Sequence, residues 1–243
     1  IESYTKALDI RETLFEKGTP EDRYATAILH SKLFRIMQTR GRMDEAESHC
    51  RQAANILEIL SADDATKVLY RITAARFYQE LGDVLVTKTD GDVEQAMENY
   101  RKSISLSESI PTSPILDETS ADGLSLREKM LSVTQMAYRR LGQRFELRQQ
   151  YDEALSAYRR ALEESEKLLA AGNPRKPSAE IVLAISLGNL GRLEAVTGDT
   201  AGGMEKVDRA IAISERTFAA DEKNYLAASE LALAYWNSGK IFL

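Results

Sequence analysis

Two histidines and one cysteine are the side chains of this 243-residue sequence best suited to metal binding or nucleophilic chemistry. His49 and Cys50 are adjacent, and adjacent side chains on a helix point about 100° apart, so they cannot chelate one ion without further ligands. We interpret Cys50 as a small packing residue. We interpret His30 as a packing residue too, with a pH-sensing or ligand-binding role as the alternative. The sequence has no HExxH, paired CxxC, P-loop or serine nucleophile elbow, so we predict a non-enzymatic protein without cofactor or metal.

Six arginines gather in two consecutive predicted helices, although the formal net charge of the chain is -6. They are Arg139, Arg140, Arg144, Arg148, Arg159 and Arg160. Carboxylates at Glu146, Asp152 and Glu153 can pair with several of them in surface salt bridges worth about 0 to 1 kcal/mol each. The alternative is an acidic peptide or a C-terminal carboxylate, because a planar guanidinium fits a carboxylate. The negative net charge and the lack of a base-reading motif argue against nucleic acid.

The composition is typical of a soluble, mostly helical protein. Only 13 residues are Gly and 5 are Pro, while 43% are hydrophobic and 29% are charged. A single cysteine excludes an intramolecular disulfide, so nothing points to an oxidising compartment. No apolar run approaches the roughly 18 residues that span a bilayer, and the first residues do not resemble a signal peptide. We therefore expect a cytoplasmic protein that does not contact membranes.

One amphipathic pattern occurs four times along the chain. Each copy has a turn, an acidic residue, a small residue, a bulky or apolar residue four places later and a small residue three places after that. These three positions are Ala46, Cys50 and Ala53; Ala96, Tyr100 and Ser103; Ala154, Tyr158 and Ala161; Gly203, Val207 and Ala210. Such spacing places all three residues on one helical face. Each copy is therefore predicted to be a helix.

A second pattern precedes each of these helices and predicts a partner helix. A large residue stands three places before Leu-Gly or its equivalent in HSKLF, YQELG, YRRLG, LGNLG and YWNSG, which begin at residues 30, 78, 138, 187 and 235. The last copy has no following helix in this sequence, whereas the opening ESYTKALDI carries Tyr4, Ala7 and Leu8 as a following helix would. We expect the chain to start and stop within units, as part of a longer array or a multidomain protein.

Turn residues between the two patterns predict antiparallel helix pairs. Glycines stand where the first helix of a pair should end, because glycine takes the left-handed conformation without strain. Aspartates stand at or near the start of the second helix, where they can cap free N–H groups. These residues are Gly41, Gly91 and Gly198, and Asp92, Asp152 and Asp199.

These motifs resemble the tetratricopeptide repeat family. One repeat matches at Tyr78, Leu81, Gly82, Leu85, Ala96 and Tyr100, and another at Tyr138, Leu141, Gly142, Phe145, Ala154, Tyr158 and Ala161. Phe34, Gln149 and Gly203 depart from the pattern and leave the local packing uncertain. The resemblance implies an all-α, right-handed superhelix (α-solenoid) of antiparallel helix pairs. Successive repeats are separated by roughly 50 to 58 residues instead of the usual 34 or so, which predicts long helices and is similar to kinesin light chain repeats.

The predicted domain is a single array over residues 1–243. It comprises the second helix of a truncated repeat at 1–18, repeats at 22–60, 63–110, 121–171 and 178–220, and the first helix of a truncated repeat at 222–243. Proline-rich loops at 110–123 and 171–178 are predicted to be flexible or sensitive to proteases. The rhythm of residues 208–240 is similar to repeat arrays that follow the catalytic domain of certain bacterial serine/threonine kinases.

The family resemblance also implies a binding groove lined by the first helices. Its predicted peptide-binding residues are Ser31, Arg35, Gln79, Asp83, Arg139, Arg140, Gln143, Asn189, Arg192, Trp236, Asn237 and Lys240. Asn189 and Asn237 match groove asparagines that bond a peptide backbone, since an amide both donates and accepts. Trp236 is either a groove anchor or a contact to a further repeat. Ser31, Gln79 and Asp83 do not reproduce the clamp of the chaperone-binding subclass.

The sequence therefore predicts a scaffold that binds proteins or peptides. If the arginine cluster takes part in binding, the ligand is expected to be acidic. Two alternatives remain open. One is a regulatory or sensor domain of a bacterial serine/threonine kinase. The other is a self-association module that uses an apolar end at Leu231, Leu233, Ile241 and Leu243.

Overall fold

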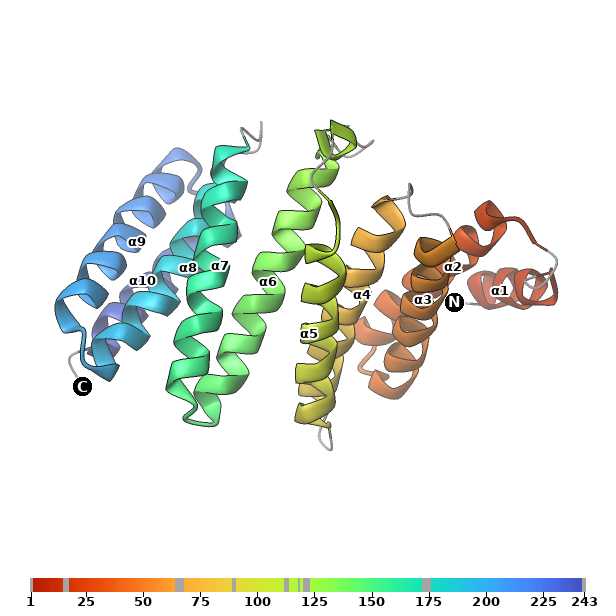
Figure 1. The fold of residues 1–243 in the computed structure, drawn as a ribbon, viewed down its shortest axis with the longest axis horizontal. Coiled ribbons are helices and arrows are strands. Elements are labelled where there is room, and N and C mark those ends of the chain that lie inside the picture. The colour runs from red at the N-terminus through yellow and green to blue at the C-terminus, as the bar shows by residue number, and fades with distance from the viewer. Residues whose placement is uncertain are drawn as a thin grey trace. The chain divides into compact units, whose positions relative to one another are not determined.

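The computed structural model describes residues 2–14, 18–63, 68–88, 91–111, 114–117, 119, 123–171 and 176–241. The described residues form ten α-helices and one 3-10 helix, with no strand beyond an isolated bridge between Thr119 and Ser125. The helices are α1 (Glu2–Leu14), α2 (Pro20–Thr39), α3 (Met43–Asp63), α4 (Val68–Thr87), α5 (Val93–Glu108), η1 (Pro114–Asp117), α6 (Leu126–Leu147), α7 (Tyr151–Ala170), α8 (Lys176–Thr197), α9 (Thr200–Ala220) and α10 (Tyr225–Ile241) (Figure 1). The all-α prediction is confirmed.

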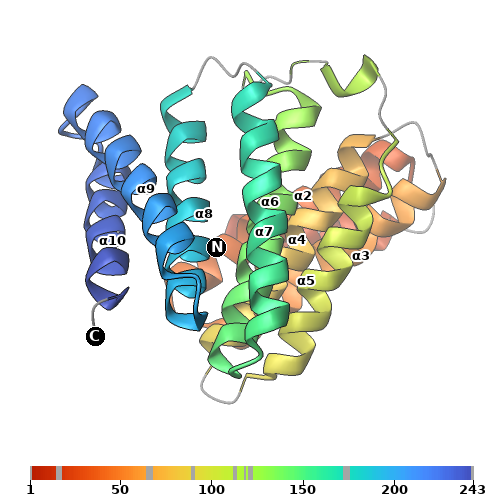
Figure 2. The same cartoon turned by 60° about the vertical axis from the view of Figure 1, so that its left-hand side comes forward.

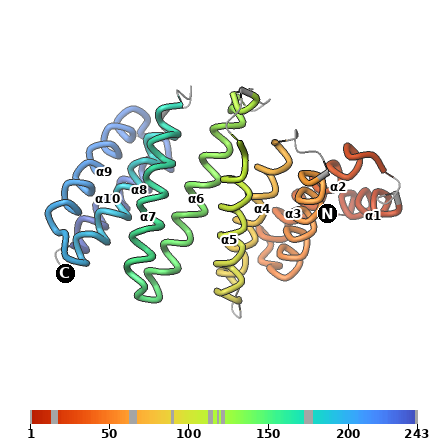
Figure 3. The backbone as a smooth tube through the Cα atoms, viewed as in Figure 1, coloured from red at the N-terminus to blue at the C-terminus, as the bar shows by residue number. Residues whose placement is uncertain are grey.

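Consecutive helices pack as antiparallel pairs. Short turns join α2 to α3, α6 to α7 and α8 to α9, and Figure 2 shows the last two of these turns clearly. The contacts of the chain divide it into two compact units, Ile1–Val133 and Thr134–Leu243, with the division inside α6. Unit 1 contains α1 to α5, η1 and the start of α6, and unit 2 contains the rest of α6 and α7 to α10. Figure 3 traces the backbone through these elements. The predicted solenoid of helix pairs is thus present in each unit.

Long helices account for the long repeat period, as predicted. α4 has 20 residues and α8 has 22, which corresponds to about 30 and 33 Å at 1.5 Å per residue. Much of the predicted loops lies outside the described residues, at 112–113, 118, 120–122 and 172–175. Their sensitivity to proteases therefore stays a prediction.

Aspartate caps start two of the second helices where the sequence predicts them. Asp92 accepts a hydrogen bond from the backbone N–H of Gln95, and Asp199 accepts one from the N–H of Gly202, both at 3.0 Å. Asp152 lies in the first turn of α7, whose N-cap is Gln150, which makes no side-chain capping bond. Asp152 therefore complements the helix dipole without being the cap.

The turn glycines are only partly as predicted. Gly41 and Gly198 have φ of 70° and 124°, in the region that favours glycine. Gly91 is not among the positive-φ residues of the described chain, so the prediction of a left-handed cap there is wrong. Gln149 occupies the turn position at which other repeats have a glycine. It adopts φ 59° itself, and this left-handed conformation costs a non-glycine residue about 1 kcal/mol.

The motif glycines are sites of close helix contact, which explains the repeated small residues. A Cβ on Gly82 would lie 2.6 Å from the Tyr100 ring, and a Cβ on Gly142 would lie 2.8 Å from the Tyr158 ring. In the pair formed by α2 and α3, the large and small residues change places. Phe34 stands at the position of the glycine and Cys50 at the position of the aromatic residue, and both are buried. The departure at Phe34 is therefore compensated by the small side chain of Cys50.

Candidate functional site

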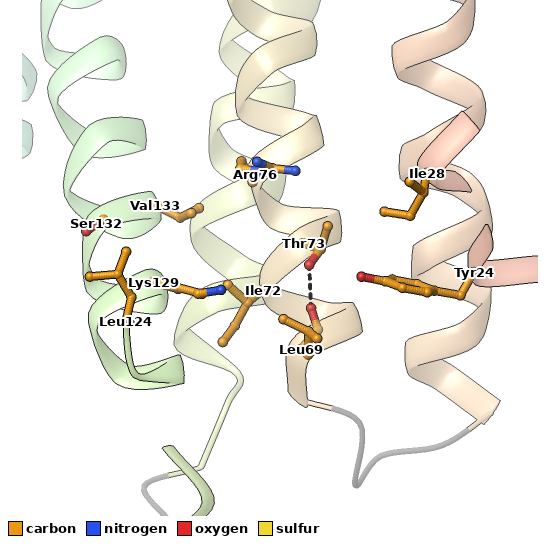
Figure 4. A pocket seen from close by; sticks show the side chains of 10 residues that line it. All are labelled: Tyr24, Ile28, Leu69, Ile72, Thr73, Arg76, Leu124, Lys129, Ser132 and Val133. Atoms are coloured by element: carbon orange, nitrogen blue, oxygen red, sulfur yellow. Dashed lines mark hydrogen bonds between the residues drawn. The ribbon is translucent and has the colours of Figure 1, made fainter. Parts of the chain in front are cut away.

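The first helices of unit 1 hold a cavity of about 570 Å³ on the face that the family resemblance assigns to a groove. The lining residues lie about one turn apart on α2, on α4, and on the first two turns of α6 together with the residue Leu124 just before it. Residues at positions i, i+3 and i+4 share one face of a helix, so each helix turns a single face toward the cavity. The lining residues are Tyr24, Ile28, Leu69, Ile72, Thr73, Arg76, Leu124, Lys129, Ser132 and Val133 (Figure 4). The volume falls within the range of roughly 300 to 1,000 Å³ that is usual for ligand sites.

The walls of this cavity, which we call the unit 1 pocket, are mainly aliphatic. Leu69 and Ile72 form the α4 side, and Ile28 faces them from α2 (Figure 4). The Tyr24 hydroxyl points toward α4, while the Tyr24 ring lies 5.0 Å from the Tyr70 ring, centroid to centroid. Thr73 donates its hydroxyl to the Leu69 carbonyl oxygen at 2.6 Å. An apolar side chain would therefore meet mostly carbon in this pocket.

Burial raises the pKa of the Tyr24 phenol above its usual value, with the neighbouring Tyr70 adding to the effect. Its hydroxyl therefore stays protonated at neutral pH and keeps a hydrogen to donate. The Tyr24 hydroxyl is thus one of a few polar groups beside mainly aliphatic walls, an arrangement typical of sites that orient a ligand.

Both charged side chains among the described lining residues are cations, Arg76 and Lys129. Arg76 lies near the Glu80 carboxylate, with 4.0 Å between Arg76 Nε and Glu80 Oε1, and its guanidinium carbon lies 5.1 Å from the centre of the Phe77 ring. Arg76 is thus held at the pocket rim by the carboxylate on one side and the ring on the other. The charged groups of the described lining are thus both positive, and the Glu80 carboxylate offsets part of the charge of Arg76.

A second, smaller cavity of about 120 Å³ lies further along the same two helices. Phe34, Arg35, Gln38, Glu80 and Asp83 line it. Arg35 Nη2 is 3.8 Å from Glu80 Oε1. Burial is the main cause that raises the pKa of Glu80. This end of the face is mixed in charge and has space only for small groups.

Two of the four predicted site residues in unit 1 line a cavity. Arg35 and Asp83 border the smaller one, and Asp83 accepts a hydrogen bond from the Tyr100 hydroxyl at 2.8 Å. Ser31 and Gln79 are each 7% exposed, and Gln79 donates to Asp83 at 3.3 Å. These two lie within the packing between helices.

Sequence reasoning missed the residues of the larger pocket. They lie one to three turns before the family motif, because the helices of this chain extend beyond it. A signal was present: Arg76 and Leu69 stand three and ten places before Gln79, which keeps them close to the same face of α4. Extending the groove pattern backwards along each long helix would have found them.

The predicted residues of α6 in unit 2 are half-buried. Arg140 donates to Gln143 at 3.5 Å, and the charge of Arg139 opposes the rise that burial causes in the pKa of the half-buried Glu230 carboxyl. Arg192 donates to Glu146 at 2.6 Å. These side chains therefore contact other parts of the unit.

The two predicted groove asparagines, Asn189 and Asn237, are 8% and 5% exposed. Asn237 lies against α8 where Gly188 has no side chain: a Cβ on Gly188 would be 3.0 Å from Asn237 Nδ2. The neighbouring first helices of unit 2 therefore meet through this amide. Their role in binding a peptide backbone stays a prediction.

Trp236 is 62% exposed, and Lys240 Nζ lies 5.4 Å from the centre of its ring. The contact is a cation–π interaction at an exposed site, worth about 0.5 to 1 kcal/mol. Of the predicted apolar end, Leu233 is 37% exposed, Leu231 and Ile241 are half-buried, and Leu243 lies outside the described residues.

Carboxylates other than those first considered pair with the arginine cluster. Arg159 lies 3.4 Å from Glu194 and Arg160 lies 2.7 Å from Glu163. Glu146 instead accepts hydrogen bonds from Arg192 and from the Tyr158 hydroxyl. The cluster is thus partly neutralised within unit 2.

The two histidines lie together in unit 1. His30 Nδ1 and His49 Nδ1 are 3.0 Å apart, so one ring donates and the other accepts. Burial, assisted by His49, lowers the pKa of His30 to about 4. Cys50 is fully buried, and its thiol donates to the Phe77 carbonyl oxygen at 3.3 Å. Across the part of the chain that the structure describes, no three His, Cys, Asp or Glu residues form a group that could hold a metal ion.

Comparison with known families gives matches in both units. Residues 75–110 and residues 134–175 each match a tetratricopeptide repeat model. These two segments therefore carry the tetratricopeptide repeat pattern. This repeat array is similar over 99% of its length to the crystal structure of BtubC (BKLC) from P. vanneervenii, with 87% of that chain covered, 19% identity and a TM-score of 0.57. That likeness supports the helical repeat fold.

A weaker likeness is to the crystal structure of nearly identical TPR-like repeats of a candidate kinesin light chain from Podosopora anserina. It covers 87% of this chain and 86% of that one, with 16% identity and a TM-score of 0.45. A search of curated proteins found no match. Among the described helices, none combines the length and apolarity needed to cross a bilayer. Tetratricopeptide repeats generally mediate contacts between proteins.

Proposed function

We propose that the first-helix face of unit 1 binds a peptide segment of a partner protein. The observation that supports this is the unit 1 pocket: an open, mostly aliphatic cavity of about 570 Å³ on the face that lines the groove in this repeat class. Burying one large apolar side chain contributes about 1.5 to 3 kcal/mol. A peptide with one bulky apolar residue would obtain its main anchor there.

The charges at the rim favour an acidic flank beside that anchor. Arg76 and Lys129 are the charged side chains among the described lining residues. A carboxylate next to the anchor residue would meet positive potential, whereas a lysine would meet like charge. The proposed ligand is therefore an apolar residue with acidic neighbours in an extended segment.

The test uses short synthetic peptides with a central Phe flanked by Asp, Ser or Lys, with binding to the 243-residue chain measured by fluorescence anisotropy. The Asp-flanked peptide should bind at least about tenfold more tightly than the Lys-flanked one. Thr73→Trp should abolish binding, because the indole fills the pocket from α4. Gln52→Trp, on the exposed face of α3, is the matched control and should bind normally.

Arg76→Gln separates the two parts of the proposal. It removes a rim charge, so the preference for Asp over Lys should shrink while the apolar anchor still binds. Peptide binding that Thr73→Trp leaves unchanged would place the site elsewhere. Equal affinity for all three peptides would contradict the proposed acidic flank but would agree with the apolar anchor.

Other interpretations of the sequence stay predictions: a piece of a larger protein, and the repeat region of a bacterial serine/threonine kinase.

A further inference from the structure

The two cavities of unit 1 lie along one face that α2 and α4 form together. Near the start of this face the Tyr24 and Tyr70 rings lie 5.0 Å apart, centroid to centroid, and further along it Arg35 Nη2 lies 3.8 Å from Glu80 Oε1. Between these two contacts the chain advances 11 residues on α2 and 10 residues on α4. The two helices therefore run side by side in the same direction, and a ligand can follow both of them from the unit 1 pocket to the smaller cavity.

The separation of the two cavities sets the spacing of ligand side chains that could fill both. On α4, the unit 1 pocket is centred near Ile72 and Thr73, and the smaller cavity is lined by Glu80 and Asp83, about nine residues or 14 Å further along the helix. An extended peptide rises about 3.3 Å per residue, and its side chains alternate between two faces. A residue four positions from the anchor is thus about 13 Å away and points to the same side as the anchor.

The smaller cavity contains a buried carboxylate oxygen that lacks a donor. Glu80 Oε2 is buried, and no group in the described part of the chain forms a hydrogen bond with it. Arg35 and Arg76 both approach the other oxygen, Oε1, at 3.8 and 4.0 Å, which is too far for a hydrogen bond. Burial raises the pKa of the Glu80 carboxyl, with the two arginines opposing the rise and Asp83 adding to it. A ligand N–H that reached Oε2 would recover the free energy that an unsatisfied buried acceptor costs.

Charge and size favour a lysine ammonium group as that donor. The charged lining of the smaller cavity consists of two carboxylates, on Glu80 and Asp83, and one cation, Arg35. The volume of about 120 Å³ suits a compact group, and an ammonium is smaller than a guanidinium or a ring. Phe34 adds carbon surface to the lining, and the methylene stem of a lysine packs well against such surface.

We propose that the peptide bound by unit 1 carries a lysine four positions from its apolar anchor, and that the lysine ammonium enters the smaller cavity against Glu80. This inference rests on the proposed function and specifies its ligand further. The anchor fills the unit 1 pocket, acidic neighbours lie beside Arg76, and the lysine meets the carboxylates beyond it. The face thus selects a peptide whose charge changes sign along its length.

The experiment compares synthetic peptides by fluorescence anisotropy with the 243-residue chain. Each has a central Phe between two Asp residues, and a lysine or a norleucine four positions before or after the Phe. Norleucine has an apolar stem of similar length and no ammonium group, so it is the matched control. For one of the two directions, the lysine peptide should bind at least about fivefold more tightly than its norleucine counterpart. Lysine three positions from the Phe points to the opposite side and should give no such gain.

Glu80→Gln tests whether the gain arises in the smaller cavity. The substitution keeps the size of the side chain and removes its charge, so the ratio of the lysine affinity to the norleucine affinity should fall to less than about twofold. Glu98→Gln removes the same charge from the exposed face of α5 and should leave that ratio unchanged. Circular dichroism confirms that both variants are folded.

The outcomes separate this inference from the proposed function. Norleucine peptides that bind, with no gain from lysine in either direction, would overturn the inference and agree with the unit 1 pocket. A lysine gain that persists in Glu80→Gln, or an equal gain at three positions, would also overturn it, because either result indicates general attraction to an acidic protein. Absence of binding by every peptide would overturn the proposed function and this inference with it.

Discussion

Neighbouring first helices meet in two different ways in the two units. In unit 1, α2 and α4 leave an open pocket between Ile28 and Thr73. In unit 2, α8 and α10 close against each other, because Gly188 has no side chain and the Asn237 amide occupies the space. The same repeat pattern thus gives an open face or a packed one, depending on one or two side chains at the groove positions.

The difference teaches that a groove position in the repeat is not by itself a binding residue. Its exposure depends on the helix beside it. Unit 1 holds the open pocket and a histidine pair of which His30 is buried, while in unit 2 α8 and α9 approach each other at the backbone. Measurements on each unit can separate these properties.

The largest effect is expected for Gly203→Ala in unit 2. A Cβ on Gly203 would clash with the Gly191 carbonyl oxygen and would lie 2.5 Å from the Ala195 backbone nitrogen. Backbone atoms cannot turn away as a side chain can, so we expect a loss of about 3 kcal/mol in the free energy of unfolding. Urea titration followed by circular dichroism measures it.

Gly82→Ala in unit 1 is the comparison for that variant. The three atoms nearest to its Cβ would all belong to the Tyr100 ring, a side chain that can shift, so the loss should be smaller. An equal loss for the two variants would contradict the statement that unit 2 is packed more tightly at the backbone.

The sequence predicted the helix pairs and their contacts well, and physical reasons explain why. Small and bulky residues at fixed spacing, such as Ala96 and Tyr100, specify which face is buried whatever the neighbours are, and both are at most 1% exposed. Gly203 stands where the other repeats have alanine, and the structure explains this difference. Because glycine has no methyl group, the backbones of α8 and α9 can approach each other there.

The site was harder to predict, since it depends on neighbouring first helices that are far apart in sequence. Nothing local marks Asn237 as buried; its burial follows from Gly188, almost fifty residues earlier. The unit 1 pocket requires Tyr24, Leu69 and Lys129 to converge from three helices. The periodic pattern can place these residues on one face of each helix, but it does not show that the space between the helices stays open.

The second prediction concerns pH and unit 1 alone, because both histidines lie there. Burial lowers the pKa of His30 to about 4 and also lowers the pKa of His49, while Glu12 and Glu45 oppose the change at His49. The unfolded chain therefore binds more protons below about pH 6.5, the ordinary histidine pKa. The two neutral histidines therefore make their full contribution to the free energy of unfolding above pH 6.5. As the pH falls toward 4, the free energy of unfolding decreases by about 2 kcal/mol.

Urea unfolding at several pH values, with wild type and His30→Gln side by side, measures this loss. The difference between them isolates the histidine from carboxylates that titrate in the same range. Hydrogen exchange should place the loss in α2 and α3. Identical pH slopes for the two proteins would contradict the prediction.

The third prediction concerns Asn237→Ala, which sharpens the contrast between packing and binding. Removal of a buried amide at the contact of α8 with α10 should lower the free energy of unfolding by about 1 kcal/mol. Ligand binding at the unit 1 pocket should not change, because Asn237 is not among its lining residues. Thermal unfolding and the peptide assay test the two statements separately. A weaker peptide affinity with unchanged stability would restore Asn237 as a groove residue.

The smallest effect is expected for Trp236→Ala. The side chain is 62% exposed, and its one described ring contact is the exposed Lys240 ammonium group, so the free energy of unfolding should change by no more than about 0.5 kcal/mol. Urea titration measures it, with Lys240→Ala as the matched variant for the same contact. A loss as large as that of Asn237→Ala would mean that Trp236 is buried in solution. Unit 2 would then cover, through association, a surface that the single chain exposes.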